Sequence, residues 1–233
     1  TIFTTMTALA NTHKAVNLAQ GFPDFDGPDL GKHAAQQAIT DGVNQYAPLA
    51  GLPTLKDAIA RWSADYNQLP CDPTTEVTIT SGCTEAIAAT LLGLVNPGDE
   101  VILFEPFYDS YRAAVAMAGA TARFVTIKPS PTGFTFDKAD LEAVFNDRTR
   151  AILVNTPHNP TGMVMTDAQL TLIADLCKKH DALAFSDEVY ERLTFDEHTH
   201  RSIATIPGMR ECTVVMSSIG KTFSLTGWKV GWT

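Results

Sequence analysis

Short apolar runs alternate with helical patterns along most of this chain, and this alternation constrains its fold more than any other feature. Strands are predicted at 76–80, 100–104, 122–127, 151–156, 182–187 and 213–218. Helices are predicted at 53–66, 84–95, 108–119, 138–145 and 166–180. Near-continuously apolar strands separated by helices are typical of a mostly parallel sheet covered on both faces. We therefore predict an α/β fold.

Charge, cysteine spacing and the length of the apolar runs argue against several classes of protein. The 17 Lys and Arg residues against 26 Asp and Glu residues give a net charge of -9, which disfavours binding to nucleic acid. The longest apolar run, 86–95, is too short to cross a membrane. The four cysteines form no CxxC pair and no metal-like spacing. We expect a cytoplasmic protein with reduced thiols and no metal site.

Polar and aromatic residues follow the predicted strands at the point where each strand ends. Ligands of such sheets bind beyond the carboxyl ends of the strands. Five strand ends are followed by "SGCTEA", "EPFYDSY", "PHNPTG", "EVYERL" and "IGKTFS". Because all of these stretches reach the same edge of the sheet, they predict a ligand site there.

A phosphate-binding turn is predicted between the first strand and the helix that follows it. The small residues Gly82, Cys83 and Thr84 can expose backbone N–H groups at the positive end of that helix. Ser218 can add a hydroxyl and Lys229 a positive charge. The alternative is an ordinary strand–helix turn in which Thr84 caps the helix.

Four further residues have both a functional and a structural interpretation. Asp187 ends an apolar strand, where a carboxylate is costly unless a cation compensates it; otherwise it caps a helix. Tyr190 falls on the same side of the chain if a helical turn follows. Asn159 lies between His158 and a proline and is either a ligand group or a turn residue. Phe107 can stack on a flat ligand or belong to the core.

Lys221 is the candidate nucleophile. A free lysine amine with a pKa of ~10.4 is neutral in about one molecule in 2,500 at pH 7. In an apolar pocket beside another cation it loses its proton and attacks carbonyls. An amine, phosphate-binding groups, a carboxylate, a phenol and a stacking ring at one edge together indicate pyridoxal 5′-phosphate (PLP), whose ring serves as an electron sink when its nitrogen is protonated.

The stretches "NQYAPLAG", "NTPHNPTG", "SDEVY" and "GKTFSLTGWKVGW" resemble those of class I/II aminotransferases in the PLP fold-type I superfamily. The similarity covers essentially the whole chain and is greatest to the branch that holds methionine and kynurenine (glutamine) aminotransferases. The resemblance implies a large PLP-binding domain with a mostly parallel sheet, at 41–233, preceded by an N-terminal arm and small-domain-side segment at 1–40.

The resemblance also implies a role for each site residue. Lys221 forms the Schiff base with PLP and moves the proton, Asp187 pairs with the ring nitrogen, and Tyr190 and Asn159 bind the phenolic oxygen. Phe107 stacks on the ring. The phosphate is held by Gly82, Cys83, Thr84, Ser218 and Lys229. In a homodimer, Tyr46 reaches the phosphate of the neighbouring subunit, and the backbone at Gly21 approaches the substrate carboxylate together with Asn159.

The sequence departs from the family pattern in three ways. Many relatives have Arg at the position of Lys229, so a point charge replaces a bidentate group here. Cys83 stands where Ala or Thr is frequent. The family continues beyond "GWKVGW" with a C-terminal small domain and the arginine that binds the substrate carboxylate. We expect that the chain ending at Thr233 is truncated.

The resemblance implies transfer of the α-amino group of a neutral amino acid (methionine, glutamine, kynurenine or aromatic type) to a 2-oxo acid. A cysteine-conjugate or cystathionine-type β-lyase fits the same residues. A PLP-sensing regulator would need an N-terminal DNA-binding module, and the family-like arm starts at Thr1. A Rossmann nucleotide binder would need a GxGxxG motif after a strand, which the sequence lacks.

Overall fold

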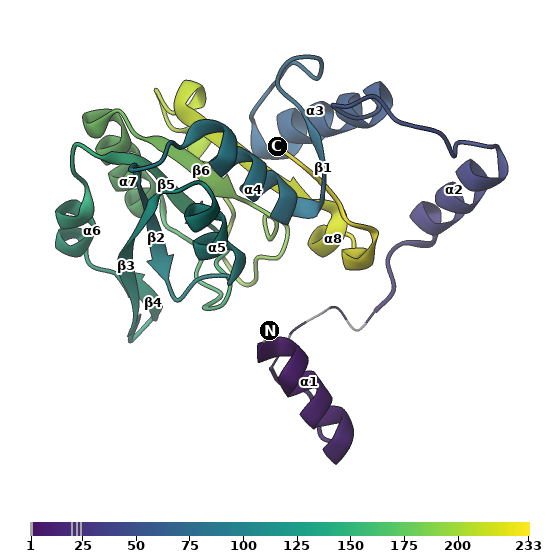
Figure 1. Ribbon diagram of the computed structural model, residues 1–233, viewed down its shortest axis with the longest axis horizontal. Helices are drawn as coiled ribbons and strands as arrows, with labels where there is room; N and C mark the ends of the chain where they lie inside the picture. Colours follow the sequence, from purple (N-terminus) through teal and green to yellow (C-terminus); the bar gives the residue numbers. More distant parts are fainter. Residues whose placement is uncertain (1, 20, 22, 24) are drawn as a thin grey trace.

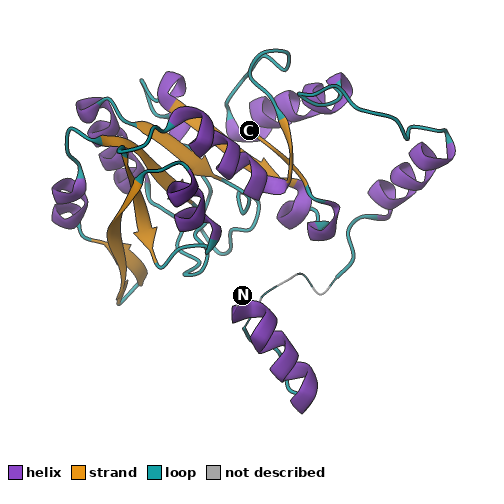
Figure 2. Ribbon diagram, in the orientation of Figure 1, coloured by secondary structure: helices purple, strands orange, loops and turns teal. Residues whose placement is uncertain are grey.

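A sheet of eight strands forms the centre of the computed structural model, which describes residues 2–19, 21, 23 and 25–233 (Figures 1 and 2). Its strand order is β1-β8-β7-β6-β5-β2-β3-β4 within these residues. The strands are β1 (Ile79–Ser81), β2 (Glu100–Glu105), β3 (Thr121–Ser130), β4 (Gly133–Phe136), β5 (Thr149–Asn155), β6 (Leu183–Asp187), β7 (Thr213–Ser218) and β8 (Val230–Trp232).

The prediction of a mostly parallel sheet is confirmed. The five central strands, in the order β3-β2-β5-β6-β7, pair in parallel. Antiparallel pairs add β4 at one edge and β8 and β1 at the other. All six predicted strands exist, and β4 and β8 are additional. Both are short, and β4 forms a hairpin with β3, which extends β3 to Ser130.

Helices cover both faces of the sheet, as the alternating pattern predicted. The helices α4 (Gly82–Leu94) and α5 (Ser110–Met117) pack on one face, and α6 (Lys138–Val144) and α7 (Asp167–His180) pack on the other. Along β2, Val101 and Leu103 pack in the apolar cluster under α4 and α5. Ile102 and Phe104 point to the opposite face and pack in the cluster under α6 and α7. Each such buried side chain stabilises the fold by about 1.5–3 kcal/mol.

Local signals explain where α7 begins and ends, whereas the predicted start of α5 was wrong. Thr166 and Gln169 form a reciprocal capping box at the start of α7, and Asp181 ends that helix in a left-handed conformation. The prediction started α5 at Tyr108, but α5 begins at Ser110. As a result, the side chains of residues 107–109 lie in the loop that follows β2.

The N-terminal region contains two helices that the sequence did not indicate, α1 (Ile2–His13) and α2 (Asp29–Thr40). Figure 1 shows them apart from the sheet, and neither helix buries a residue among those described. The third helix, α3 (Pro53–Asn67), lies near the β1 edge of the sheet and begins with a proline, as predicted. The domain boundary predicted at residue 40 coincides with the end of α2 and stays a prediction.

Short helical turns complete the described chain: η1 (Ile203–Thr205), η2 (Arg210–Cys212), α8 (Ile219–Thr222) and η3 (Thr226–Trp228). Lys221 lies on α8, directly after β7. Within the described residues, none of the helices has both the length and the apolar character that crossing a membrane requires.

Candidate functional site

A cavity of about 940 Å³ opens at the carboxyl ends of β5, β6 and β7, beside the start of α4. Every predicted site residue except Tyr46 lines it: Gly21, Gly82, Cys83, Thr84, Phe107, Asn159, Asp187, Tyr190, Ser218, Lys221 and Lys229. Residues from nearly the whole length of the sequence therefore meet at the edge of the sheet that the strand ends predicted.

Tyr46 lies outside this cavity. It belongs to the loop between α2 and α3, and its side chain is fully exposed. Leu49, in the same loop, is equally exposed. The structure therefore does not bring Tyr46 to the site of its own chain, and its predicted role in a neighbouring subunit stays a prediction.

Two glycines shape the part of the cavity where α4 begins. Gly82 has a φ of 76°, a left-handed conformation that favours glycine. Gly231 of β8 packs so tightly that a Cβ there would lie 2.7 Å from the Cys83 nitrogen and would overlap the Gly82 backbone. Because Gly231 pairs with both Thr80 and Ser218, its small size lets α4, β1 and β7 converge.

The start of α4 offers an environment for an anion. The side chain of Ser81, the residue before α4, does not cap the first turn, although the Ser81 backbone N–H itself donates to the Glu85 carboxylate. Lys229 lies alongside, with its Cδ 3.7 Å from the position of a Cβ on Gly82. The helix dipole and this lysine both favour a negative group. Ser218 adds its hydroxyl from the end of β7.

Asp187 is the buried carboxylate of the cavity, with 4% of its surface exposed. Tyr111 donates a hydrogen bond of 2.6 Å to Oδ2, and the backbone N–H of Val189 donates one of 3.2 Å to Oδ1. The Cys83 thiol lies 3.7 Å from Oδ1. Burial raises the pKa of Asp187, and these donors oppose the shift. No cationic side chain of the described residues forms an ion pair with Asp187.

Asn155 connects the ends of β5 and β6. Its Nδ2 donates to the Asp187 carbonyl oxygen at 3.0 Å, and its Oδ1 accepts from the Asn159 backbone N–H at 2.8 Å. Asn159 in turn donates through Nδ2 to the Tyr190 hydroxyl at 3.4 Å. Burial raises the pKa of Tyr190 to about 12, so this hydroxyl keeps its proton. Asn155 and these hydrogen bonds therefore connect the three predicted residues Asp187, Asn159 and Tyr190.

Lys221 faces Tyr190 across the cavity. Its Nζ lies 5.6 Å from the centre of the Tyr190 ring, and the side chain is half-buried. Burial and then the charge of Lys229 lower the pKa of Lys221, while Asp187 opposes the shift. A lysine with a lowered pKa is a better nucleophile near neutral pH.

The rings that follow β2 differ in what they contact. The Phe107 ring stacks on Phe124 at 5.7 Å between centroids. The Tyr108 ring packs edge-on against Tyr111 at 5.8 Å and lies near enough to Tyr190 to raise its pKa slightly by charge. Both Phe107 and Tyr108 line the cavity.

Sequence reasoning missed three residues of this site, Tyr108, Tyr111 and Asn155. Each was visible as a polar or aromatic residue at a predicted strand end, in "EPFYDSY" or "AILVNT". The sequence did not reveal that α5 starts late, which leaves Tyr108 in the loop and places Tyr111 in its first turn.

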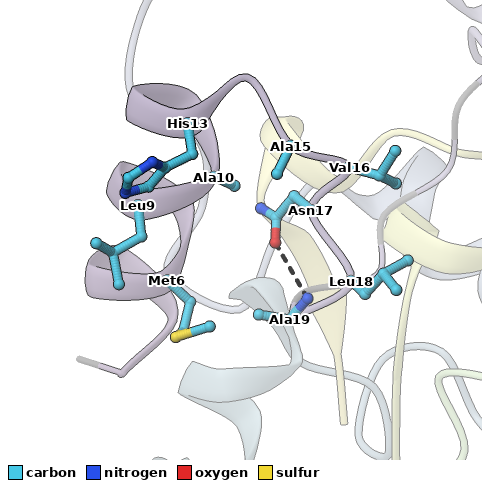
Figure 3. A pocket seen from close by; sticks show the side chains of 9 residues that line it. All are labelled: Met6, Leu9, Ala10, His13, Ala15, Val16, Asn17, Leu18 and Ala19. Carbon is cyan, nitrogen blue, oxygen red and sulfur yellow. Dashed lines mark hydrogen bonds between the residues drawn. The ribbon is translucent and has the colours of Figure 1, made fainter.

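A second cavity, of about 440 Å³, lies between α1 and the segment that follows it (Figure 3). Its wall is mainly apolar, with Met6, Leu9 and Val16 among its residues. Asn17 accepts a hydrogen bond of 3.0 Å from the Ala19 backbone, as Figure 3 shows. None of the predicted site residues lines this cavity.

Comparisons with known proteins agree with this arrangement. A family model described as aminotransferase class I and II matches residues 13–233. The whole chain is 49% identical to a probable N-succinyldiaminopimelate aminotransferase of Mycobacterium tuberculosis, of which it spans 58%. It is 41% identical to the methionine aminotransferase of Escherichia coli, of which it spans 60%. A mouse kynurenine–oxoglutarate transaminase is 45% identical over 99% of the chain, which spans 53% of that protein.

Solved structures show the same fold. The structure of N-succinyldiaminopimelate aminotransferase from M. tuberculosis superposes with a TM-score of 0.97, covering 100% of this chain and 60% of that one. The E. coli methionine aminotransferase gives a TM-score of 0.94, with 100% and 61% covered. These neighbours confirm the prediction of the fold-type I architecture.

Proposed function

This chain belongs to the class I and II aminotransferase family, and we propose that it forms the cofactor-binding part of an enzyme that moves the α-amino group of a neutral amino acid to a 2-oxo acid. The family is PLP-dependent. The chain spans about 58% of the first curated relative that it matches. The activity, the substrates and the partners below are therefore proposed for the whole protein.

The residues of the cavity fit PLP. The buried Asp187 carboxylate has only neutral donors around it, and a protonated ring nitrogen would supply the positive charge that its burial calls for. The start of α4, with Lys229 and Ser218, suits a phosphate, and Lys221 offers a primary amine. When bound, PLP supplies an electron sink for charge at the substrate α-carbon.

The side chains divide this work among them. We assign to Asp187 the task of keeping the ring nitrogen protonated, because a buried carboxylate stabilises a neighbouring cation strongly. Lys221, with its lowered pKa, is the group that carries a proton to and from the α-carbon. Asn159 and Tyr190 form a hydrogen-bonded pair that orients the phenolic oxygen. The aromatic face is assigned to Tyr108, because the Phe107 ring already stacks on Phe124.

The wall of the cavity supports a neutral substrate side chain. Ile2, Phe3 and Leu18 line it from α1 and the segment after α1, together with the backbone of Gly21. No arginine of the described residues lines the cavity. An apolar wall favours a large uncharged side chain, and methionine and kynurenine appear in the names of two relatives.

We propose that the whole protein is a cytoplasmic homodimer. The fully exposed Tyr46 and Leu49 support an interface between copies, since large side chains with no cover are typical of interfaces. In that dimer, Tyr46 of one subunit reaches the phosphate site of the other. All four cysteines are free thiols, which suits a reducing compartment.

The observation that carries the proposal is the meeting of Lys221, Asp187 and the start of α4 in one cavity. The test is to load the whole protein with PLP and supply methionine with a 2-oxo acid. We expect the amino acid that corresponds to the oxo acid to form. Formation of pyruvate from a cysteine conjugate, without amino transfer, would favour a β-lyase instead, and the absence of PLP binding would refute both.

A further inference from the structure

Two carboxylates and one imidazole lie buried behind the turn that carries Asp187 and Tyr190. They belong to Glu188, Glu191 and His200, and their candidate ligand atoms lie within 4.8 Å of one another. The Glu188 side chain is completely buried, and that of His200 is 5% exposed. None of the three lines the cavity, so the proposed chemistry does not use them directly.

The Glu188 carboxylate has donors on both oxygens. Its Oε1 accepts hydrogen bonds of 2.7 Å from the hydroxyls of Ser186 and Ser202. Its Oε2 lies 3.0 Å from His200 Nε2. Burial lowers the pKa of His200, but Glu188, together with the charge of Glu191 and the Thr156 backbone, outweighs burial and raises this pKa overall. The imidazole therefore serves as the counter-charge of Glu188.

Glu191 links the same turn to α3. It accepts hydrogen bonds from Trp62 Nε1, at 3.1 Å, and from Asn67 Nδ2. The Trp62 ring also packs 5.7 Å from the ring of Phe223, which lies two residues after Lys221. One tryptophan of α3 thus contacts both the Tyr190 turn and the segment that carries the lysine.

The backbone of Glu188 is fixed as well. Its N–H donates to the Met216 carbonyl oxygen at 2.8 Å, and the Ser217 hydroxyl donates to the Glu188 carbonyl oxygen at 3.4 Å. Asp187, on one side of Glu188, and Tyr190, two residues beyond it, line the cavity, while the Glu188 side chain points into the buried cluster. Because the Glu188 backbone and side chain are both fixed by hydrogen bonds, the positions of Asp187 and Tyr190 are restricted as well.

These contacts favour a positioning role over a metal site. Both Glu188 oxygens and both Glu191 oxygens are already engaged by protein donors. We propose that Glu188, locked by His200 and Ser202, is a positioning residue that holds Asp187 and Tyr190 in place for the cofactor. This inference rests on the proposed function, because it concerns the same PLP site.

The test compares two buried glutamates in the whole protein. Glu188→Gln removes the charge behind the cavity. Glu100→Gln is the matched control, because Glu100 is 1% exposed and paired with Arg148 and Arg123, and it does not line the cavity. Both variants should unfold at lower urea concentration than the parent protein.

Only Glu188→Gln should change the site. We expect the apo-form of this variant to bind PLP about tenfold more weakly than the parent apo-protein. This is the lower end of the loss in affinity seen when residues that orient metal ligands are replaced. We also expect the visible band of the loaded protein to change at a higher pH, because a displaced Tyr190 stabilises the ionised phenolic oxygen less. Glu188→Gln combined with His200→Asn, which replaces the ion pair by two amides, should recover most of the affinity.

The outcomes separate the two hypotheses. If the parent protein fails to bind PLP, the proposed function is wrong. If the parent binds PLP and Glu188→Gln behaves like Glu100→Gln in affinity and in the pH of the spectral change, the positioning role is refuted. Should Glu188→Gln fail to fold, Ser202→Ala removes one donor and keeps the charge. It should weaken PLP binding by less than the roughly tenfold expected for Glu188→Gln, because the charge stays, and an unchanged affinity would refute the role.

Discussion

Replacing Tyr111 by Phe removes the shortest hydrogen bond to Asp187 and little else. The Tyr111 ring is buried in the cluster between α4, α5 and the sheet, and Phe keeps that packing. The lost bond is 2.6 Å long and ends on a buried carboxylate. A hydrogen bond to a charged group contributes about 1.5–3 kcal/mol, so we expect the free energy of unfolding to fall by about this amount at pH 7.

The loss should shrink in acid, and the pKa shift gives the direction. Burial raises the pKa of folded Asp187 above 3.8, so the carboxyl becomes neutral at a pH above the value in the unfolded chain. A group of this kind contributes stability below its unfolded pKa and loses that contribution as pH rises through the folded pKa. Once Asp187 is protonated, the bond from Tyr111 joins two neutral groups and contributes about 0.5–1.5 kcal/mol.

Urea unfolding of the apo-protein at a series of pH values from 7 down to 4 follows this decrease. Tyr66→Phe is the control, because Tyr66 is about half exposed and lies outside the cavity. We expect this control to change stability by less than about 0.5 kcal/mol at each pH. An equal loss at every pH for Tyr111→Phe, or a loss no larger than the control's, would show that Tyr111 does not stabilise an ionised Asp187.

Three further predictions concern the whole site. Asp187→Asn should still bind PLP but lose most amino transfer in a steady-state assay, because a neutral amide does not hold the ring proton; a small loss of rate would make Asp187 a structural residue. Mixing Tyr46→Ala and Lys221→Ala chains should restore activity, since a heterodimer then contains one intact site; no recovery with heterodimers verified would count against the crossing of Tyr46. Residues 1–233 expressed alone with PLP should show no useful transamination, because no described arginine lines the cavity to bind the substrate carboxylate; a soluble, active product would place that anchor within these residues.

The sheet could be predicted from the sequence because its strands are buried on both faces. Residues 151–154, for example, are apolar at every position, so this strand can be recognised even where the helix boundaries are predicted wrongly. β4 and β8 could not be predicted, since each is too short to show a periodic pattern. The helices α1 and α2 were not predicted either, because residues 1–40 were interpreted as an arm and a small-domain-side segment.

The residues of the site were predictable as types at strand ends, but their contacts were not. The order of the strands brings Lys221 and Asp187 to one cavity, and the rule for carboxyl ends predicts this much. The roles of Tyr108 and Phe107 depend on where α5 begins, which differs from the prediction by two residues. The Glu188 and His200 pair joins residues that no motif connects, so only the folded structure reveals it.

The central claim is that Lys221 is the amine that binds PLP, and covalent labelling tests it directly. Borohydride reduction of the PLP-loaded whole protein fixes the cofactor to the amine that holds it, and peptide mapping locates the label. Because burial and Lys229 lower the pKa of Lys221, we expect the label on Lys221 alone, retained in Lys229→Ala at saturating PLP and lost in Lys221→Ala. Label on Lys229, or on no lysine, would contradict the account.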